Sequence, residues 1–267
     1  MRLVYLGTPE SAVAPLQALV DAGHEIALVV TRADKRRGRG SGTSPSPVKA
    51  AAERLGLPVS HDVDDVLGVD AELGVVVAFG RLIAPHVLAE LPMINLHFSL
   101  LPRWRGAAPV ERAILAGDDV TGVCVMAVEE GLDTGAIHAV VEVPIGSTTT
   151  ADELRLELVH AGTRLLLDTL AEGLQLPTEQ TGTPTFAAKI DPAELRIDWS
   201  RPADEINRLI RVGGAWTTFR GERVKIHAAD LVDGTIVPTV VQPAGRARMD
   251  AAAWRHGARP ADDEWFE

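Results

Sequence analysis

The stretch Leu73–His97, LGVVVAFGRLIAPHVLAELPMINLH, decides the fold class of this chain. Its first part, Leu73 to Phe79, is a short apolar run that predicts a buried strand. Pro85 is favoured at the first position of a helix, and the helical pattern ends near Leu91. Met93 to His97 then predicts a second strand. A strand, a helix and a strand in this order indicate a parallel βαβ unit.

The residues before this stretch repeat the alternation of strands and helices. Apolar runs predict strands at Arg2–Gly7 and Ile26–Val30, and prolines mark helix starts at Pro9 and Pro47. We therefore expect an α/β fold with a doubly wound, mostly parallel, Rossmann-like sheet. Ligands of such sheets bind beyond the carboxyl ends of the strands, where His97 would lie.

Composition narrows the class of protein. Of the 267 residues, 46% are hydrophobic and 24% are charged, which is ordinary for a soluble globular chain. The one cysteine, Cys124, excludes a disulfide framework and a cysteine-based metal site. The sequence has neither a signal peptide nor an apolar run of eighteen residues, so we expect a cytoplasmic protein without a membrane segment.

Asn95 and His97 are the leading candidates for chemistry. Residues i and i+2 of a strand point to the same side, so these two side chains would project together from a strand end. An amide can donate to a developing oxyanion, and an imidazole exchanges protons near neutral pH. Asp133, in the loop segment Gly131–Gly135, could orient and charge the imidazole. This set suits direct acyl transfer to an amine, although each residue alone would more often be structural.

Three segments carry a resemblance to a known family. They are Gly7–Glu10 (GTPE), Ser44–Lys49 (SPSPVK) and Ile94–Pro109 (INLHFSLLPRWRGAAP). Together they resemble the 10-formyltetrahydrofolate-dependent formyltransferases, and in particular the methionyl-tRNA formyltransferase family. The resemblance extends from Met1 to about Arg211.

The resemblance implies transfer of the formyl group of 10-formyltetrahydrofolate to the free α-amine of methionyl-initiator tRNA, with tetrahydrofolate as the other product. It implies a monomer and no metal. Asn95, His97 and Asp133 match the family's catalytic residues one by one. Asn95 and protonated His97 would stabilise the oxyanion, while Asp133 would hold His97 and support proton removal. The match to the family's folate-binding loop comprises Ser99, Leu100, Leu101 and Pro102.

A basic stretch stands out on a chain whose net charge is −11. Its cationic residues lie among glycines, which indicates a solvated, flexible loop or a site of focused phosphate contact. In the family, the loop at this position enters the acceptor end of the initiator tRNA. The candidate tRNA-binding residues are Arg32, Lys35, Arg36, Arg37 and Arg39.

The tail of the chain is short for this family. We expect a catalytic domain at residues 1–200, a helix and linker at 201–214, and a small β-module at 215–267. Trp216 to Val241 leaves room for about three short strands. The family usually has a five-stranded oligonucleotide-binding barrel here, so we expect an incomplete OB-like module.

Two alternatives remain open at this point. Ser11 stands where the family often has an aromatic residue near the methionyl side chain, so the amine substrate could instead be an amino sugar or another small amine. The third hypothesis is a non-catalytic paralogue that binds tRNA or folate. The presence of Asn95, His97 and Asp133 together argues against it.

Overall fold

The chain folds into two compact units. The computed structural model describes residues 1–36, 43–261 and 264–267. The first unit comprises Met1–Pro109, Val120–Pro144 and Arg155–Ala187, and the second comprises Val110–Asp119, Ile145–Leu154 and Ala188–Glu267. The division expected at residues 200 and 214 stays a proposal.

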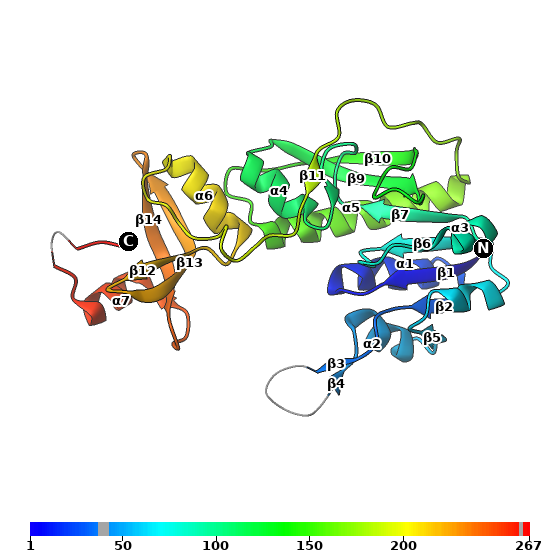
Figure 1. Cartoon of the computed structure of the whole chain (residues 1–267), viewed down its shortest axis with the longest axis horizontal. Helices are drawn as coiled ribbons and strands as arrows, with labels where there is room; N and C mark the ends of the chain where they lie inside the picture. The colour runs from blue at the N-terminus through cyan, green and yellow to red at the C-terminus, as the bar shows by residue number, and fades with distance from the viewer. Residues whose placement is uncertain (37–42, 262–263) are drawn as a thin grey trace. The chain divides into compact units, whose positions relative to one another are not determined.

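The first unit is built on a seven-stranded sheet (Figure 1). Five neighbouring strands are parallel, and two antiparallel strands extend the sheet at one edge. After β1 the chain adds β2 and β5 on one side and then β6 and β7 on the other side, so the order of the strands reverses between β1 and β6. In spatial order the strands are β10 (Ile137–Pro144), β9 (Val120–Ala127), β7 (Met93–His97), β6 (Leu73–Val77), β1 (Arg2–Gly7), β2 (Glu25–Val30) and β5 (Val59–Ser60).

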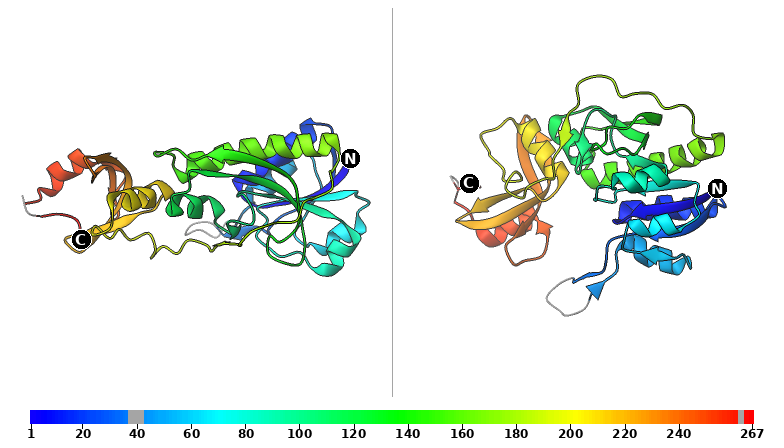
Figure 2. Two further views of the ribbon diagram at one scale, coloured as in Figure 1. Left: turned by 90° about the horizontal axis from the view of Figure 1, so that it is seen from above. Right: turned by 45° about the vertical axis from the view of Figure 1, so that its right-hand side comes forward.

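Both faces of the central strand β1 are buried. Alternate residues of β1 point to opposite faces, yet Leu3, Val4, Tyr5 and Leu6 are all fully buried. Helix α5 lies along the sheet (Figure 2), and its Gly162 sits against side chains of β7 and β9. The helices of the first unit are η1 (Glu10–Ala12), α1 (Val13–Asp21), α2 (Pro47–Arg54), η2 (Asp64–Gly68), α3 (Pro85–Glu90) and all but the first turn of α5 (Ala151–Glu172).

Local sequence signals set several helix starts. Helices α2 and α3 begin at Pro47 and Pro85, as predicted. A capping box begins α5: the Thr150 amide donates to Glu153 at 2.9 Å, and the Glu153 amide donates to the Thr150 hydroxyl at 3.3 Å. None of the helices in the described residues is long and apolar enough to cross a membrane.

Two pairs of very short strands complete the first unit. Strands β3 (Lys35–Arg36) and β4 (Thr43–Ser44) form the base of a hairpin. Strands β8 (Arg105–Gly106) and β11 (Phe186–Ala187) pair in parallel and tie the segment after α5 to the segment after β7.

The second unit contains a four-stranded antiparallel sheet with helices α4 (Pro109–Ala116), α6 (Ala203–Val212) and α7 (Ala251–Ala258). The strand order is β12 (Trp216–Phe219), β13 (Glu222–Val232), β14 (Thr235–Pro243) and β15 (Met249–Asp250). Its core is apolar and partly aromatic; among its buried members are Ile206, Ile210, Phe219, Ile226, Val241 and Phe266.

The predicted fold class, a mostly parallel α/β sheet followed by a small β-module, is confirmed. The strands of the β-module differ from the expected three short ones, because β13 and β14 span eleven and nine residues. Two-residue turns join the strands: Arg220–Gly221 after β12 and Asp233–Gly234 after β13, all four with positive φ. Positive φ at both central residues is the pattern of type I′ hairpins, which let long strands pair directly.

Candidate active site

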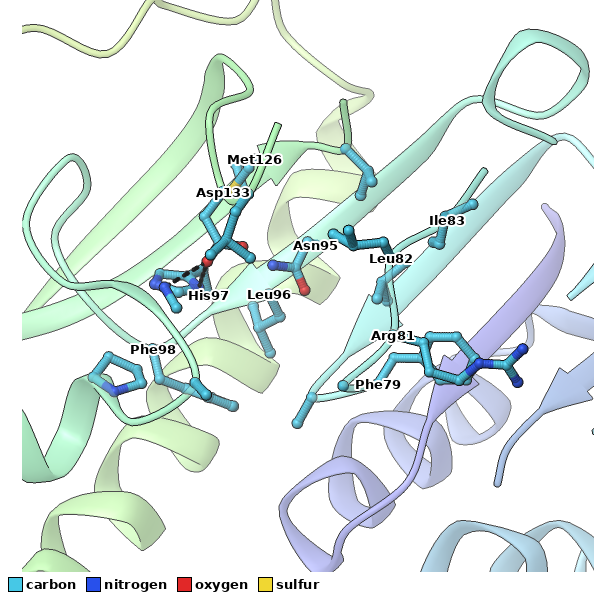
Figure 3. Close-up of a pocket in the computed structure, with 18 of the residues that line it drawn as sticks. Phe79, Arg81, Leu82, Ile83, Asn95, Leu96, His97, Phe98, Met126 and Asp133 are labelled. Carbon is cyan, nitrogen blue, oxygen red and sulfur yellow. Dashed lines mark hydrogen bonds and ion pairs between the residues drawn. The ribbon is translucent and has the colours of Figure 1, made fainter. Parts of the chain in front are cut away.

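A pocket of about 530 Å³ opens at the carboxyl ends of β1, β6 and β7 (Figure 3). This is the edge where the sequence predicted a ligand site. Asn95, His97 and Asp133 all line the pocket, so the structure brings the three predicted catalytic side chains together. The remaining lining residues include Pro9, Val76, Ala78, Phe79, Gly80, Arg81, Leu82, Ile83, Phe98, Gly106, Ala107, Pro109, Met126, Val128, Glu129 and Leu132.

His97 is buried at the end of β7, with 6% of its surface exposed. Its Nε2 lies 3.0 Å from the carbonyl oxygen of Trp104. A carbonyl oxygen can only accept, so Nε2 carries a proton and Nδ1 is the nitrogen left for chemistry. Nδ1 lies 3.7 Å from Oδ2 of Asp133. A proton gained at Nδ1 would therefore be stabilised by the Asp133 carboxylate.

Asp133 is held in an unusual backbone conformation, with a φ of 51°. Its Oδ2 accepts a hydrogen bond of 2.8 Å from the backbone amide of Gly106. The loop packs closely behind the aspartate: a Cβ added at Gly135 would lie 1.9 Å from the carbonyl oxygen of Ala127. These contacts fix a carboxylate with a side-chain exposure of only 15% beside His97.

Asn95 lies between the His97–Asp133 pair and Leu82, as Figure 3 shows. It precedes His97 by two residues on β7, and its register partner on β9 is Met126, another pocket residue. A side-chain amide at this position can donate hydrogen bonds to an oxygen bound in the pocket. The three side chains thus offer a donor, a proton acceptor and a carboxylate to one small volume.

Comparison with known proteins identifies the family. The pattern of the family described as "Formyl transferase" matches residues 1–170, and that of "Formyl transferase, C-terminal domain" matches residues 189–235. The chain belongs to the formyl transferase family. Two of its relatives are named methionyl-tRNA formyltransferase. The one from Dinoroseobacter shibae is 48% identical and covers 88% of this chain and 84% of its own length. The one from Roseobacter denitrificans is 43% identical and covers 100% and 99%.

A solved structure of the same fold is HypX from Aquifex aeolicus in complex with tetrahydrofolic acid. Its TM-score is 0.68 at 16% identity, and the match covers 100% of this chain and 50% of that one. The formyl transferase chain described here therefore spans about half the length of HypX. At this identity the likeness concerns the fold alone.

The predicted folate loop does not line the pocket. Ser99 is fully buried, and its hydroxyl donates to the carbonyl oxygen of Arg103 at 2.6 Å. Leu101 packs against Cys124 and Met126, and the peptide bond between Leu101 and Pro102 is cis. In the sequence, the pocket residue Phe98 is followed directly by Ser99, Leu100, Leu101 and Pro102. Their role in folate binding stays a prediction.

The predicted tRNA-binding residues that the structure describes lie at or just before the β3–β4 hairpin. Lys35 is exposed, whereas Arg32 is half-buried and its Nε has no hydrogen-bond partner within the part of the protein that the structure describes. Lys49 of α2 pairs with Asp34 at 2.9 Å beside this hairpin. Arg36 is in β3, while Arg37 and Arg39 lie outside the described residues.

Sequence reasoning missed a large part of the pocket. The turn from Ala78 to Ile83 follows β6 and forms one wall, with Leu82 74% exposed at its surface. The position of Phe79-Gly80 after a buried strand places this turn at the ligand-binding edge of the sheet, but no role was predicted for its residues. Trp104 and Gly106 bind His97 and Asp133 through backbone atoms, so the side chains of these two residues gave no indication of the contacts. Across the described residues, no group of three or more His, Cys, Asp or Glu is arranged to hold a metal ion.

Proposed function

We propose that this protein transfers the formyl group of 10-formyltetrahydrofolate to the α-amine of methionyl-initiator tRNA, acting as a cytoplasmic monomer. The observation that carries the proposal is the meeting of Asn95, His97 and Asp133 at one pocket in a formyl transferase. The identity of 43–48% to enzymes named methionyl-tRNA formyltransferase selects the amine substrate.

The pocket fits the chemistry of a folate. A pterin is flat, apolar on its faces and polar at its edge. Phe79, Ile83, Met126 and Val128 supply apolar walls, and the turn after β6 supplies backbone hydrogen-bonding groups. The volume of about 530 Å³ lies within the range of about 300–1,000 Å³ usual for ligand pockets. The formyl donor provides an activated acyl carbon attached to nitrogen.

Asn95, His97 and Asp133 then assist direct attack by the amine. The amine nitrogen bonds to the formyl carbon, and the bond from that carbon to the folate nitrogen breaks. The amide of Asn95 donates to the negatively charged oxygen that develops, together with protonated His97. The carboxylate of Asp133 stabilises the charged imidazole until it accepts the proton lost by the amine, and this proton then passes to the departing nitrogen.

The basic residues at the β3–β4 hairpin bind the acceptor end of the tRNA in this proposal. The body of the protein is acidic, with a net charge of −11, so a local cluster of cations is needed to hold phosphates. Lys35 and Arg36 belong to β3, and Arg37 and Arg39 follow them in the sequence.

The test is formyl transfer from 10-formyltetrahydrofolate to methionyl-initiator tRNA by the full chain. Asn95→Asp is the matched blank, because it keeps the size of the side chain and removes its two donors. We expect formyl-methionyl tRNA from the parent and a rate lower by about 100- to 1,000-fold for Asn95→Asp, the usual effect of losing an oxyanion donor. An Asn95→Asp variant as active as the parent would remove Asn95 from the mechanism.

The same assay decides between amine substrates. Ser11 lies in η1, where the family often has an aromatic residue, and this departure favours a smaller amine. A nucleotide-linked amino sugar is therefore offered as a competing acceptor. Formylation of the sugar in place of the aminoacyl-tRNA would replace the proposed substrate while keeping the donor. Folate binding without transfer to either amine would indicate a non-catalytic paralogue.

A further inference from the structure

Gln180 stands out in the segment that connects α5 to β11. Residues 171–179 and 181–184 are all exposed, and Gln180 alone in that stretch is half-buried. The segment is pinned two residues earlier, where Thr178 and Ile137 exchange two backbone hydrogen bonds of 2.8 Å. This bridge directs the side chain of Gln180 toward the loop of Asp133.

The amide of Gln180 uses both of its donors on that loop. Nε2 donates to the carbonyl oxygen of Asp133 at 2.9 Å and to that of Gly135 at 2.8 Å. The first of these carbonyls belongs to the peptide unit that directly follows Asp133, whose φ of 51° is in the left-handed region. The backbone strain of such a residue is tolerated only where surrounding contacts hold it.

The carbonyl oxygen of the same side chain binds Arg105 of β8. Oε1 of Gln180 accepts from Nη2 of Arg105 at 2.6 Å and from Nε at 3.1 Å. The next residue, Gly106, is the one whose amide donates to the carboxylate of Asp133. The hydrogen bonds therefore form a closed ring: Gln180 to Arg105, along the chain to Gly106, across to the carboxylate of Asp133, and from its carbonyl back to Gln180.

We propose that Gln180 is a positioning residue, which sets the distance between Asp133 and His97 by clamping the Asp133 loop to β8. The inference rests on the proposed function, because Asp133 must take part in the reaction for its position to affect turnover. Gln180 does not line the pocket, so it acts through Asp133 and not on a substrate.

The first test follows the structure directly and does not depend on activity. Gln180→Met keeps the length of the side chain and removes all four hydrogen bonds. We expect amide hydrogen exchange at Gly106 and across residues 131–135 to accelerate by about 10-fold, because their partners are no longer held. Gln175→Met is the matched control, since Gln175 is exposed in the same segment and its side-chain amide donates only to the end of α5 and the residue that follows it. Unchanged exchange at Gly106 in Gln180→Met would overturn the proposal.

The second test uses kinetics. For Gln180→Met we expect kcat to fall by about 10- to 100-fold, because a misplacement of a catalytic group by about 1 Å has an effect of this size. The KM values for 10-formyltetrahydrofolate and for methionyl-initiator tRNA should stay within about 3-fold of the parent. Gln180→Glu should behave alike, because it keeps an acceptor for Arg105 and loses both donors. Parent-like kcat in either variant would contradict the positioning role.

A double-mutant cycle separates positioning from a general loss of stability. In an Asp133→Asn background, Gln180→Met should lower kcat by less than about 2-fold, because the group it positions is already disabled. Fully additive losses would overturn the proposal. A parent that forms no formylated product would refute the proposed function, while the exchange experiment would still decide whether Gln180 holds the loop.

Discussion

The negative charge of Asp133 is central to the proposed chemistry, and replacing Asp133 by asparagine tests it. In Asp133→Asn, the side-chain oxygen can still accept from the Gly106 amide, which lies 2.8 Å away in the parent. The variant therefore keeps the loop and loses only the negative charge that faces Nδ1 of His97. We expect kcat to fall by about 1,000-fold or more, by analogy with other carboxylates that support a catalytic histidine. Folate affinity should stay within about 3-fold, since the pocket is unchanged.

Steady-state formylation and equilibrium folate binding together check this prediction. Glu130→Gln is the charge-matched control, because Glu130 lies in the same loop but is exposed and outside the pocket lining. Equal turnover in Asp133→Asn and the parent would exclude Asp133 from proton transfer.

Some of the residue-scale geometry was predictable and some was not. Asn95 and His97 are two residues apart on one strand, so their shared direction follows from strand geometry alone. Which nitrogen of His97 is free depends on the carbonyl of Trp104, seven residues later, in a loop with no regular structure. Gln180 reaches Asp133 across 47 residues. No local pattern encodes such a contact, because it exists only once β8 and β11 have paired.

The beginning of α5 offers a prediction at the scale of an element. Hydrogen bonds from the Thr150 amide and then the Thr150 hydroxyl hold the pKa of the Glu153 carboxyl below its usual range. Such a carboxyl stabilises the fold above its unfolded pKa of about 4.3, and this contribution is lost as the pH falls through the lower folded pKa. Thr150→Ala should lower the free energy of unfolding by about 1 kcal/mol at pH 7, the usual value of an N-cap.

Denaturant unfolding followed by circular dichroism at pH 7 and pH 3 measures this effect. Part of the difference between parent and Thr150→Ala should disappear at pH 3. Thr148→Ala, at an exposed position in the same threonine run, is the control. An effect that grows on acidification would contradict the assignment of the cap.

The β3–β4 hairpin supports a second prediction at this scale. Replacing both Lys35 and Arg36 by alanine should weaken tRNA binding and flatten the plot of log affinity against log salt by about one unit for each phosphate that is no longer neutralised. The double replacement of Arg164 and Lys189, two cations elsewhere on the chain, changes the net charge equally. Equal slopes for the two double variants would separate this hairpin from tRNA binding.

At the scale of the whole molecule, the layered α/β unit followed from alternation of apolar runs with proline-started helices. The β-module was harder to predict. Dividing the 26 residues from Trp216 to Val241 by an average strand length gave three short strands, whereas β13 and β14 are long. The Asp233–Gly234 turn was a signal for a long hairpin that this count overlooked. The alignment with the Roseobacter denitrificans relative spans 304 positions, more than the 267 residues of this chain. This chain thus lacks residues that the relative has, and the shortened tail stays a prediction.

The second unit has a sheet of four strands, and aromatic rings form part of its hydrophobic core. Phe266 is 8% exposed and stacks on Trp199 and Trp254, with ring centroids 5.6 and 5.1 Å away. Its neighbours fix the segment: the Glu267 amide donates to the carbonyl oxygen of Thr218 at 2.9 Å. Phe266→Ala should destabilise this unit by about 3–5 kcal/mol, the usual cost of removing a buried phenylalanine ring. The folate pocket lies wholly in the first unit and should persist.

Tryptophan fluorescence can follow this unit selectively, because four of the five tryptophans belong to it and only Trp104 belongs to the other. We expect the fluorescence transition of Phe266→Ala to move to lower denaturant while folate binding at low denaturant remains. Phe186→Ala is the control, since that ring is 63% exposed and its removal leaves little cavity. A fluorescence midpoint equal to that of the parent would mean that Phe266 is dispensable to the core. Simultaneous loss of folate binding would mean that the two units unfold as one.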